Sequence, residues 1–260
     1  MISKGKKAAQ KLMEECGIDN PTEIPLELVV HGRGATLIDK PLKSADGRIV
    51  FGERRSIITV NSNIEFLGKR RFTIAHELGH HEMHRNLAII HNDSDATLEY
   101  FKYGNQEAEA NEFASELLMP EAIFIKENRD KKFSPNLLSE LANKFQTSIT
   151  SAAYKYFELG SHPICLFYSF NNQLKYWKHP TDYSHFITDR NRLPPPDDSV
   201  AAEFFSKKII YPQEESKQQI YKSTWFTLSR GEDDSDYKFY EYCIITPKYN
   251  TVLSVVWEEV

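Results

Sequence analysis

A cluster of histidines is the feature that most constrains this sequence. Five of the nine histidines fall within sixteen residues: His76, His80, His81, His84 and His91. Within this cluster, His76, Glu77 and His80 spell H-E-x-x-H in the segment RFTIAHELGHHEMH. The apolar residues of the segment recur at helical spacing, so we expect a helix over residues 69–84. Its other residues are largely apolar, which is typical of a buried helix.

The spacing of His76 and His80 suits a bound metal ion. Residues four apart on a helix differ by only about 40° around its axis, so both imidazoles can reach one ion. Two nitrogen ligands at this spacing are typical of zinc. Glu77 points about 100° away, where its carboxylate can take a proton from a water on the metal. The motif therefore predicts a zinc centre that activates water to attack a peptide carbonyl.

A catalytic zinc needs a third protein ligand, and the helix expected over residues 105–118 offers two glutamates. Glu107 and Glu109 flank the apolar stripe of this helix on opposite sides. Glu107 has Asn111 one turn later, and this amide can hydrogen-bond a ligand and fix its orientation. We favour Glu107 as the third ligand, with Glu109 as the alternative. The longer H-E-x-x-H-x-x-G-x-x-H pattern is absent, so we expect His84 to be a surface or supporting residue.

Residues 1–160 carry mostly helical patterns around one small strand-rich segment. We expect its strands to form an antiparallel meander, because a Ser-Ala-Asp-Gly turn at residues 44–47 separates the first two. These elements predict an α+β domain that is mainly helical. Besides the two helices already named, the expected helices cover residues 6–16, 25–30, 121–129, 135–145 and 149–158, and the expected strands cover residues 35–38, 48–51 and 57–60.

Residues 161–260 have a different, strand-rich texture. The change near Gly160 predicts a domain boundary, with one domain over residues 1–160 and a β-rich α/β domain over residues 161–260. We expect the second domain to sense a signal, to regulate the first or to dock its substrate. The expected strands cover residues 164–170, 174–177, 221–228, 242–246 and 252–257.

The two motifs together resemble a known family. RFTIAHELGHHEMH, followed by E-x-x-A-N-x-F-A-x-x-L-L-M-P at residues 107–120, is similar to the pattern of the ImmA/IrrE zinc metallopeptidases. The resemblance covers roughly residues 1–160. It implies a zincin-like catalytic domain with a gluzincin-like site, in which His76, His80 and Glu107 bind Zn²⁺ and Glu77 is the general base.

The resemblance also implies a biological task. Family members cleave a helix-turn-helix transcriptional repressor at a specific site, which derepresses mobile-element, phage or stress-response genes. Some members carry a GAF-like sensor domain after the peptidase domain, so residues 161–260 are a candidate for such a domain. For the side chain that stabilises the oxyanion, Tyr100, Tyr103 and Tyr154 are candidates by residue type only.

Two alternatives remain open beside the protease. The first is a metal-binding antirepressor that disables its partner without proteolysis. The second is a DNA-binding regulator, because residues 138–160 have helix-turn-helix texture. Against DNA binding, Gln146 stands in the turn where glycine is commoner, and Lys155 is the single basic residue of the would-be recognition helix. The net charge of −5 also disfavours it. We therefore interpret this segment as a pair of packing helices.

Composition excludes several other classes of protein. With 260 residues, 40% of them hydrophobic, the chain can bury a substantial core. No apolar run approaches the roughly 18 residues that a membrane span requires. Its three cysteines are far apart and lack C-x-x-C spacing, which indicates free thiols in a reducing compartment. We therefore expect a cytoplasmic protein that does not bind membranes.

Overall fold

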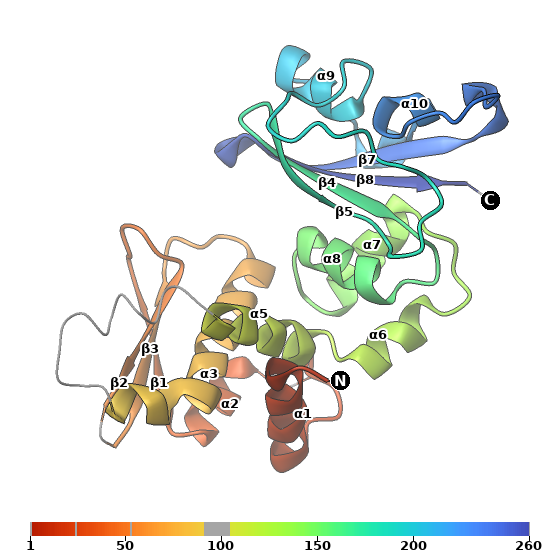
Figure 1. The fold of residues 1–260 in the computed structure, drawn as a ribbon. Helices are drawn as coiled ribbons and strands as arrows, with labels where there is room; N and C mark the ends of the chain where they lie inside the picture. Colours follow the sequence, from red (N-terminus) through yellow and green to blue (C-terminus); the bar gives the residue numbers. More distant parts are fainter. Residues whose placement is uncertain (1, 24, 53, 91–104, 260) are drawn as a thin grey trace. The chain divides into compact units, whose positions relative to one another are not determined.

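A computed structural model describes residues 2–23, 25–52, 54–90 and 105–259 of the chain (Figure 1). The residues divide into two compact units. The first unit comprises Met1–Glu127 and Leu141–Ser151, and the second comprises Asn128–Glu140 and Ala152–Val260. The domain boundary expected near residue 160 stays a prediction.

Helices dominate the first unit and cross one another closely. A Cβ atom at Gly79 would lie 3.0 Å from the Phe113 ring, and one at Gly5 would lie 2.3 Å from the Glu109 backbone oxygen. Glycine at these two positions lets α3 and α1 approach α5, which fixes the faces that α3 and α5 turn toward each other. The helices are α1 (Lys4–Cys16), α2 (Leu26–Gly32), α3 (Leu67–Ile90), α5 (Asn105–Leu118) and α6 (Glu121–Asn128).

The small sheet of the first unit is mixed, which corrects the expected antiparallel meander. Its order is β1-β3-β2, with β1 (Ala35–Lys40) parallel to β3 (Ser56–Asn61) and β2 (Gly47–Phe51) antiparallel to β3. The side chain of Asn61 donates to Leu42 O and Ala45 O and accepts from Leu42 N. These bonds tie the β1–β2 connection to the end of β3, so β3 lies between the two strands that a hairpin would have paired.

One hydrophobic core joins the sheet to α3 and α5. Ile58 on β3, Ile74 and Leu78 on α3, and Phe113 and Leu117 on α5 are fully buried in it. The apolar face of α3 is therefore covered, and the histidine face of the same helix is held at a defined angle to α5.

Two helices follow α6, as the sequence predicted. They are α7 (Pro135–Lys144) and α8 (Ile149–Leu159). The turn between them contains Gln146 at φ +50°, a left-handed conformation that favours glycine. Ser148 then caps α8, because its Oγ accepts from the backbone N–H of Ser151.

The second unit is built on a five-stranded antiparallel sheet in the order β5-β4-β8-β7-β6. Strand β8 is buried along nearly its whole length, which matches its almost continuous apolar sequence. Trp257 on β8 packs edge-on against Phe133, with ring centroids 4.7 Å apart. The strands are β4 (Cys165–Phe170), β5 (Gln173–Lys178), β6 (Gln218–Ile220), β7 (Phe239–Thr246) and β8 (Thr251–Glu258).

Two short helices of the second unit were not predicted. Helix α9 (Val200–Lys207) begins at Ser199, and its first backbone N–H groups donate to the buried carboxylate of Glu241. Helix α10 (Lys222–Trp225) lies where a strand was expected over residues 221–228. That expectation was wrong because its aromatic residues pack as a one-turn helix, with the Trp225 ring stacked on Phe167.

None of the helices in the described ranges combines the length and the apolar character needed to cross a membrane.

Candidate metal centre

Helix α3 presents His76 and His80 on the same face, as the H-E-x-x-H spacing predicted. Their Nε2 atoms lie 3.1 Å apart. The remainder of this stretch of α3 is buried in the core, so the two imidazoles are held by a rigid element rather than by a loop. Burial and the neighbouring rings of His76 and His84 lower the pKa of His80 to about 3. His80 is therefore a neutral imidazole, the form that binds metal.

Glu107 reaches the same point from α5. Its Oε2 lies 3.2 Å from His76 Nε2, and its Oε1 lies 3.3 Å from His80 Nε2. One donor atom from each of the three residues lies within 4.8 Å of the other two. Glu107 is 41% exposed, so its carboxylate stands at the open side of the cluster. The structure thus brings together the three residues that the sequence singled out.

A hydrogen bond from α5 orients His76. Its Nδ1 lies 3.0 Å from Asn111 Oδ1, which can only accept. Nδ1 therefore carries the proton in the neutral ring, and the lone pair is on Nε2, facing His80 and Glu107. Asn111 was expected to orient a ligand because it stands one turn after Glu107. It does contact a candidate ligand, but on the facing helix.

A second chain of hydrogen bonds orients His80. His80 Nδ1 lies 3.0 Å from His84 Nδ1, and His84 Nε2 lies 2.9 Å from Glu109 Oε2. With His84 donating to the Glu109 carboxylate, its Nδ1 accepts from His80 and leaves the His80 lone pair on Nε2. Glu109 also forms an ion pair with Lys4 at 2.7 Å. In this arrangement Glu109 supports a candidate ligand while Glu107 lies among the donor atoms.

The position of His84 corrects one part of what was expected of it. Its side chain is fully buried between His80 and Glu109, so it is a supporting residue and not a surface one. Sequence reasoning missed the His84–Glu109 contact because it depends on how α3 and α5 face each other. The helical spacing of His80 and His84 was the available signal.

These donors fit a divalent cation. Two imidazole lone pairs and a carboxylate converge on one point, and nitrogen and oxygen donors of these kinds are the ones that zinc accepts. Each imidazole is also hydrogen-bonded through its other nitrogen, as metal-binding histidines usually are. In the tautomers that these bonds set, both imidazole lone pairs face the Glu107 carboxylate, an arrangement that a shared cation would balance.

Glu77 lies beside this cluster on α3 and is 7% exposed. Burial and the charge of Glu107 raise its pKa to about 8. Strand β2 covers it closely, since a Cβ atom at Gly47 would lie 2.8 Å from Glu77 Oε1 and 2.5 Å from Thr73 Cγ2. Sequence reasoning treated Gly47 only as part of a turn and missed this contact.

Comparisons with known proteins agree with this geometry. Residues 31–157 match the IrrE N-terminal-like domain of peptidase family M78. An uncharacterized immunity region protein 2 of Bacillus phage phi105 is 30% identical over 120 residues, which is 45% of this chain and 70% of the phage protein. The chain belongs to the ImmA/IrrE family. M78 is a family of metallopeptidases, and the candidate metal site of His76, His80 and Glu107 lies within the matched residues.

A solved structure resembles this ImmA/IrrE protein along nearly its full length. A Mycobacterium tuberculosis transcriptional regulator matches it with a TM-score of 0.58 at 13% identity, covering 99% of this chain and 77% of the regulator. At this level of identity the likeness concerns the fold alone.

Other residues singled out from the sequence are placed as follows. His81 is a structural residue, because its ring bonds Ser56 Oγ and the Arg33 backbone oxygen. Tyr154, a candidate for stabilising the oxyanion, bonds the Tyr176 hydroxyl within the second unit. The remaining candidates, Tyr100, Tyr103 and His91, lie outside the described residues.

The structure does not support DNA binding by the helix-turn-helix-like segment at residues 138–160. Lys155, the only basic residue of α8, is 2% exposed and so cannot face a DNA phosphate. Residues Ala152, Ala153 and Tyr156 of the same helix are also buried. This ImmA/IrrE protein therefore uses α8 for packing, which is the interpretation that the sequence favoured.

Proposed function

We propose that this protein is a zinc metalloendopeptidase in which His76, His80 and Glu107 hold the metal. The convergence of their donor atoms within 4.8 Å carries the proposal. Membership of a metallopeptidase family supports the reaction class. The hydrogen bonds from Asn111 and His84 support it further, because they direct both imidazole lone pairs to the same point.

Glu77 is the proposed general base. The bound ion would supply Lewis-acid polarisation of the peptide carbonyl and lower the pKa of a water. Glu77 would accept the proton of the attacking water and then donate it to the leaving amine nitrogen, so that one carboxylate serves both steps. Burial strengthens Glu77 as a base, because an ionised carboxylate of raised pKa holds a transferred proton more firmly. The backbone of β2 at Gly47 lies close against this carboxylate, with no room for a side chain between them.

The proposed substrate is a helix-turn-helix repressor, whose cleavage would derepress mobile-element, phage or stress genes. The phage relative is an immunity region protein and the structural neighbour is a transcriptional regulator, which favours a role in gene control. Among the described strands, β2 pairs only with β3, so its other edge is open to an extended peptide. Through Gly47, that strand touches Glu77.

The second unit is proposed to regulate the peptidase or to dock its substrate, and a GAF-like sensor remains the specific form of this proposal. Its five-stranded antiparallel sheet with helices is compatible with a ligand-sensing domain. A cytoplasmic location is also part of the proposal. Free thiols at Cys16, Cys165 and Cys243 favour a reducing compartment.

The decisive experiment combines metal analysis with a cleavage assay. The substrate in the assay is a helix-turn-helix repressor, sought first among the products of the genes adjacent to this one. Wild-type protein should contain zinc and cut the repressor. His80→Ala should lose the zinc, and Glu77→Gln should keep the zinc but lose cleavage. Unchanged zinc in His80→Ala would exclude the site. Full derepression by Glu77→Gln would instead indicate an antirepressor that acts without proteolysis.

A further inference from the structure

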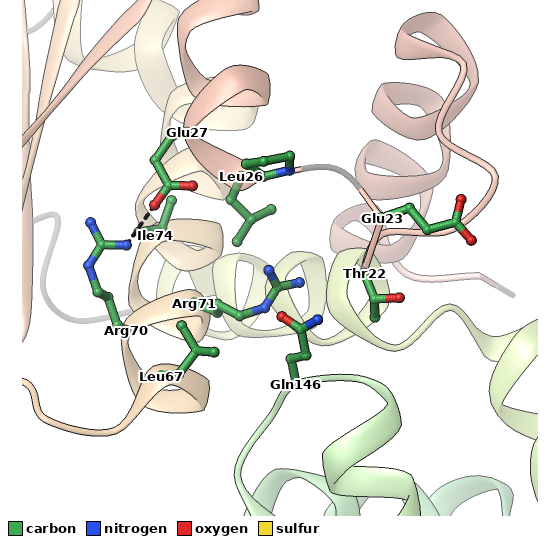
Figure 2. A pocket seen from close by; sticks show the side chains of 10 residues that line it. Thr22, Glu23, Leu26, Glu27, Leu67, Arg70, Arg71, Ile74 and Gln146 are labelled. Atoms are coloured by element: carbon green, nitrogen blue, oxygen red, sulfur yellow. Dashed lines mark hydrogen bonds and ion pairs between the residues drawn. The ribbon is translucent and has the colours of Figure 1, made fainter.

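A cavity of about 220 Å³ lies in the first unit, beside the start of α3 (Figure 2). One wall is apolar and consists of Leu26 from α2 with Leu67 and Ile74 from α3. The polar part comes from Arg71 on α3 and from Gln146 in the turn between α7 and α8. Nothing in the proposed peptidase reaction uses this cavity.

Arg71 is a buried cation that has no carboxylate partner among the described residues. Its side chain is 7% exposed, and Nη2 donates to the backbone oxygen of Pro21 at 3.2 Å. Its Nε is buried and has no hydrogen-bond partner among the described residues. Burial lowers the pKa of Arg71, and the charge of Glu27 only partly opposes this effect. A buried guanidinium normally has paired donors, so this one is incompletely satisfied.

The acidic side chains at the cavity are already engaged elsewhere. Glu27 forms an ion pair with Arg70 at 2.7 Å, and Asp39 pairs with the same arginine at 3.1 Å. Glu23 accepts from Asn20 Nδ2 at 2.8 Å. Arg70 is thus neutralised by two carboxylates, while no carboxylate of residues 2–23, 25–52, 54–90 or 105–259 forms an ion pair with its neighbour Arg71. The contrast leaves Arg71 as the cationic group available to a ligand.

Gln146 supplies a second polar group and is itself strained. Its φ of +50° is a conformation in which glycine would cost least. Figure 2 shows its side-chain amide pointing toward the Arg71 guanidinium. An arginine and an amide that converge beside an apolar wall match a carboxylate with a short aliphatic tail.

We propose that this cavity binds a small aliphatic carboxylate, held by Arg71 and Gln146 with its tail against Leu26, Leu67 and Ile74. The ligand can be a free short-chain acid or the carboxyl end of a peptide, since both offer the same group. Arg71 lies five residues before His76, about 7.5 Å along the same helix, so the ligand would bind to the element that carries the metal ligands.

Isothermal titration of the full chain with isovalerate at constant ionic strength tests the proposal. The expected Kd is about 1 mM, a typical strength for one charged contact plus a small apolar tail. Isovaleramide, which has the same shape without the charge, should bind at least about tenfold more weakly. A parallel titration with N-acetylvaline, which is isovalerate with an added α-acetamido group, separates the two sources, because only a peptide-end site gains affinity from the added amide.

Two variants and a control make the result specific. Gln146→Glu places a carboxylate beside Arg71 and should abolish isovalerate binding while raising the melting temperature. Arg71→Met should also abolish binding. Arg54→Met removes an exposed arginine of the same unit and should change neither property. The proposal is overturned if neither acid binds at about ten times the expected Kd, if the amide binds as well as the acid, or if both cavity variants bind like wild type.

Discussion

Helix α3 contains two stretches whose surroundings favour ions of opposite charge. Around residues 76–80, two imidazole lone pairs and the Glu107 carboxylate converge, which is an arrangement that a cation would balance. At residue 71, a buried guanidinium faces a cavity and has no carboxylate partner in the part of the chain that the structure describes, which is an arrangement that an anion would balance. Both stretches lie on the same rigid helix. The sign of the ion that each would bind therefore depends on its neighbours on α5, α2 and the α7–α8 turn and not on α3 alone.

The largest expected effect is a difference in zinc binding between variants of Glu107 and variants of Glu109. Glu107→Ala removes a proposed ligand, and about 4 kcal/mol of zinc-dependent stabilisation should be lost at a zinc concentration near 1,000 times Kd. Glu109→Ala only frees His84, so zinc affinity should fall about 10- to 100-fold. Thermal unfolding with and without zinc measures both. Equal losses in the two variants would mean that Glu109 is itself a ligand.

Helix α5 offers a matched control for this pair. Glu112 is a half-buried glutamate of the same helix that is neither a proposed ligand nor a hydrogen-bond partner of His84. Glu112→Ala should leave the zinc-dependent change in melting temperature as it is in the wild type. A loss in this variant would indicate that the charge of α5 as a whole, and not the position of one carboxylate, decides zinc binding.

The second effect concerns catalysis without metal loss. In Gly47→Val, the new side chain meets Glu77 Oε1 and Thr73 and must displace the carboxylate. Cleavage should fall by about 10²-fold because the proposed base is moved, while zinc content stays unchanged. Activity assays and metal analysis on the same preparation check this. Val50→Ala on the exposed face of β2 is the control, and an equal loss of activity there would implicate the strand and not the contact with Glu77.

The sequence was most informative where chemistry depends on local spacing. His76 and His80 stand four apart on one helix, so their shared face could be predicted without knowing any other element. Glu107 was preferred because of Asn111, and that residue does orient a candidate ligand, but His76 rather than Glu107. Asn111 thus contributes to the candidate site through a contact with His76 that differs from the expected contact with Glu107.

What could not be predicted depends on how separate elements meet. The His84–Glu109 bond requires the relative rotation of α3 and α5. The position of β3 between β1 and β2 requires the bonds that Asn61 makes to the connecting segment. The Arg71 cavity combines residues from α2, α3 and the α7–α8 turn, and no periodic pattern in the sequence links those three segments.

A smaller effect, of at most about 1.4 kcal/mol per pH unit, is expected in the pH dependence of the zinc-free protein. Burial and Glu107 raise the pKa of Glu77 from 4.5 to about 8. Between these values the folded state keeps a proton that the unfolded state has released, so the free energy of unfolding should decrease as pH rises through this window. Urea unfolding at several pH values in the presence of a chelator measures the slope. Glu77→Gln should flatten it, and an unchanged slope would mean that other groups determine it.

The smallest effect concerns the buried Arg71 and is measured without any ligand. Arg71→Met replaces an incompletely satisfied buried charge by an apolar side chain, so the free energy of unfolding should rise by about 1 kcal/mol. Arg33→Met is the matched control, because Arg33 forms ion pairs with Glu82 and Glu15 and its loss strands both carboxylates. That variant should be destabilised. If urea unfolding shows Arg71→Met destabilised as strongly as Arg33→Met, Arg71 is an ordinary structural cation, and the opposition between the two stretches of α3 no longer holds.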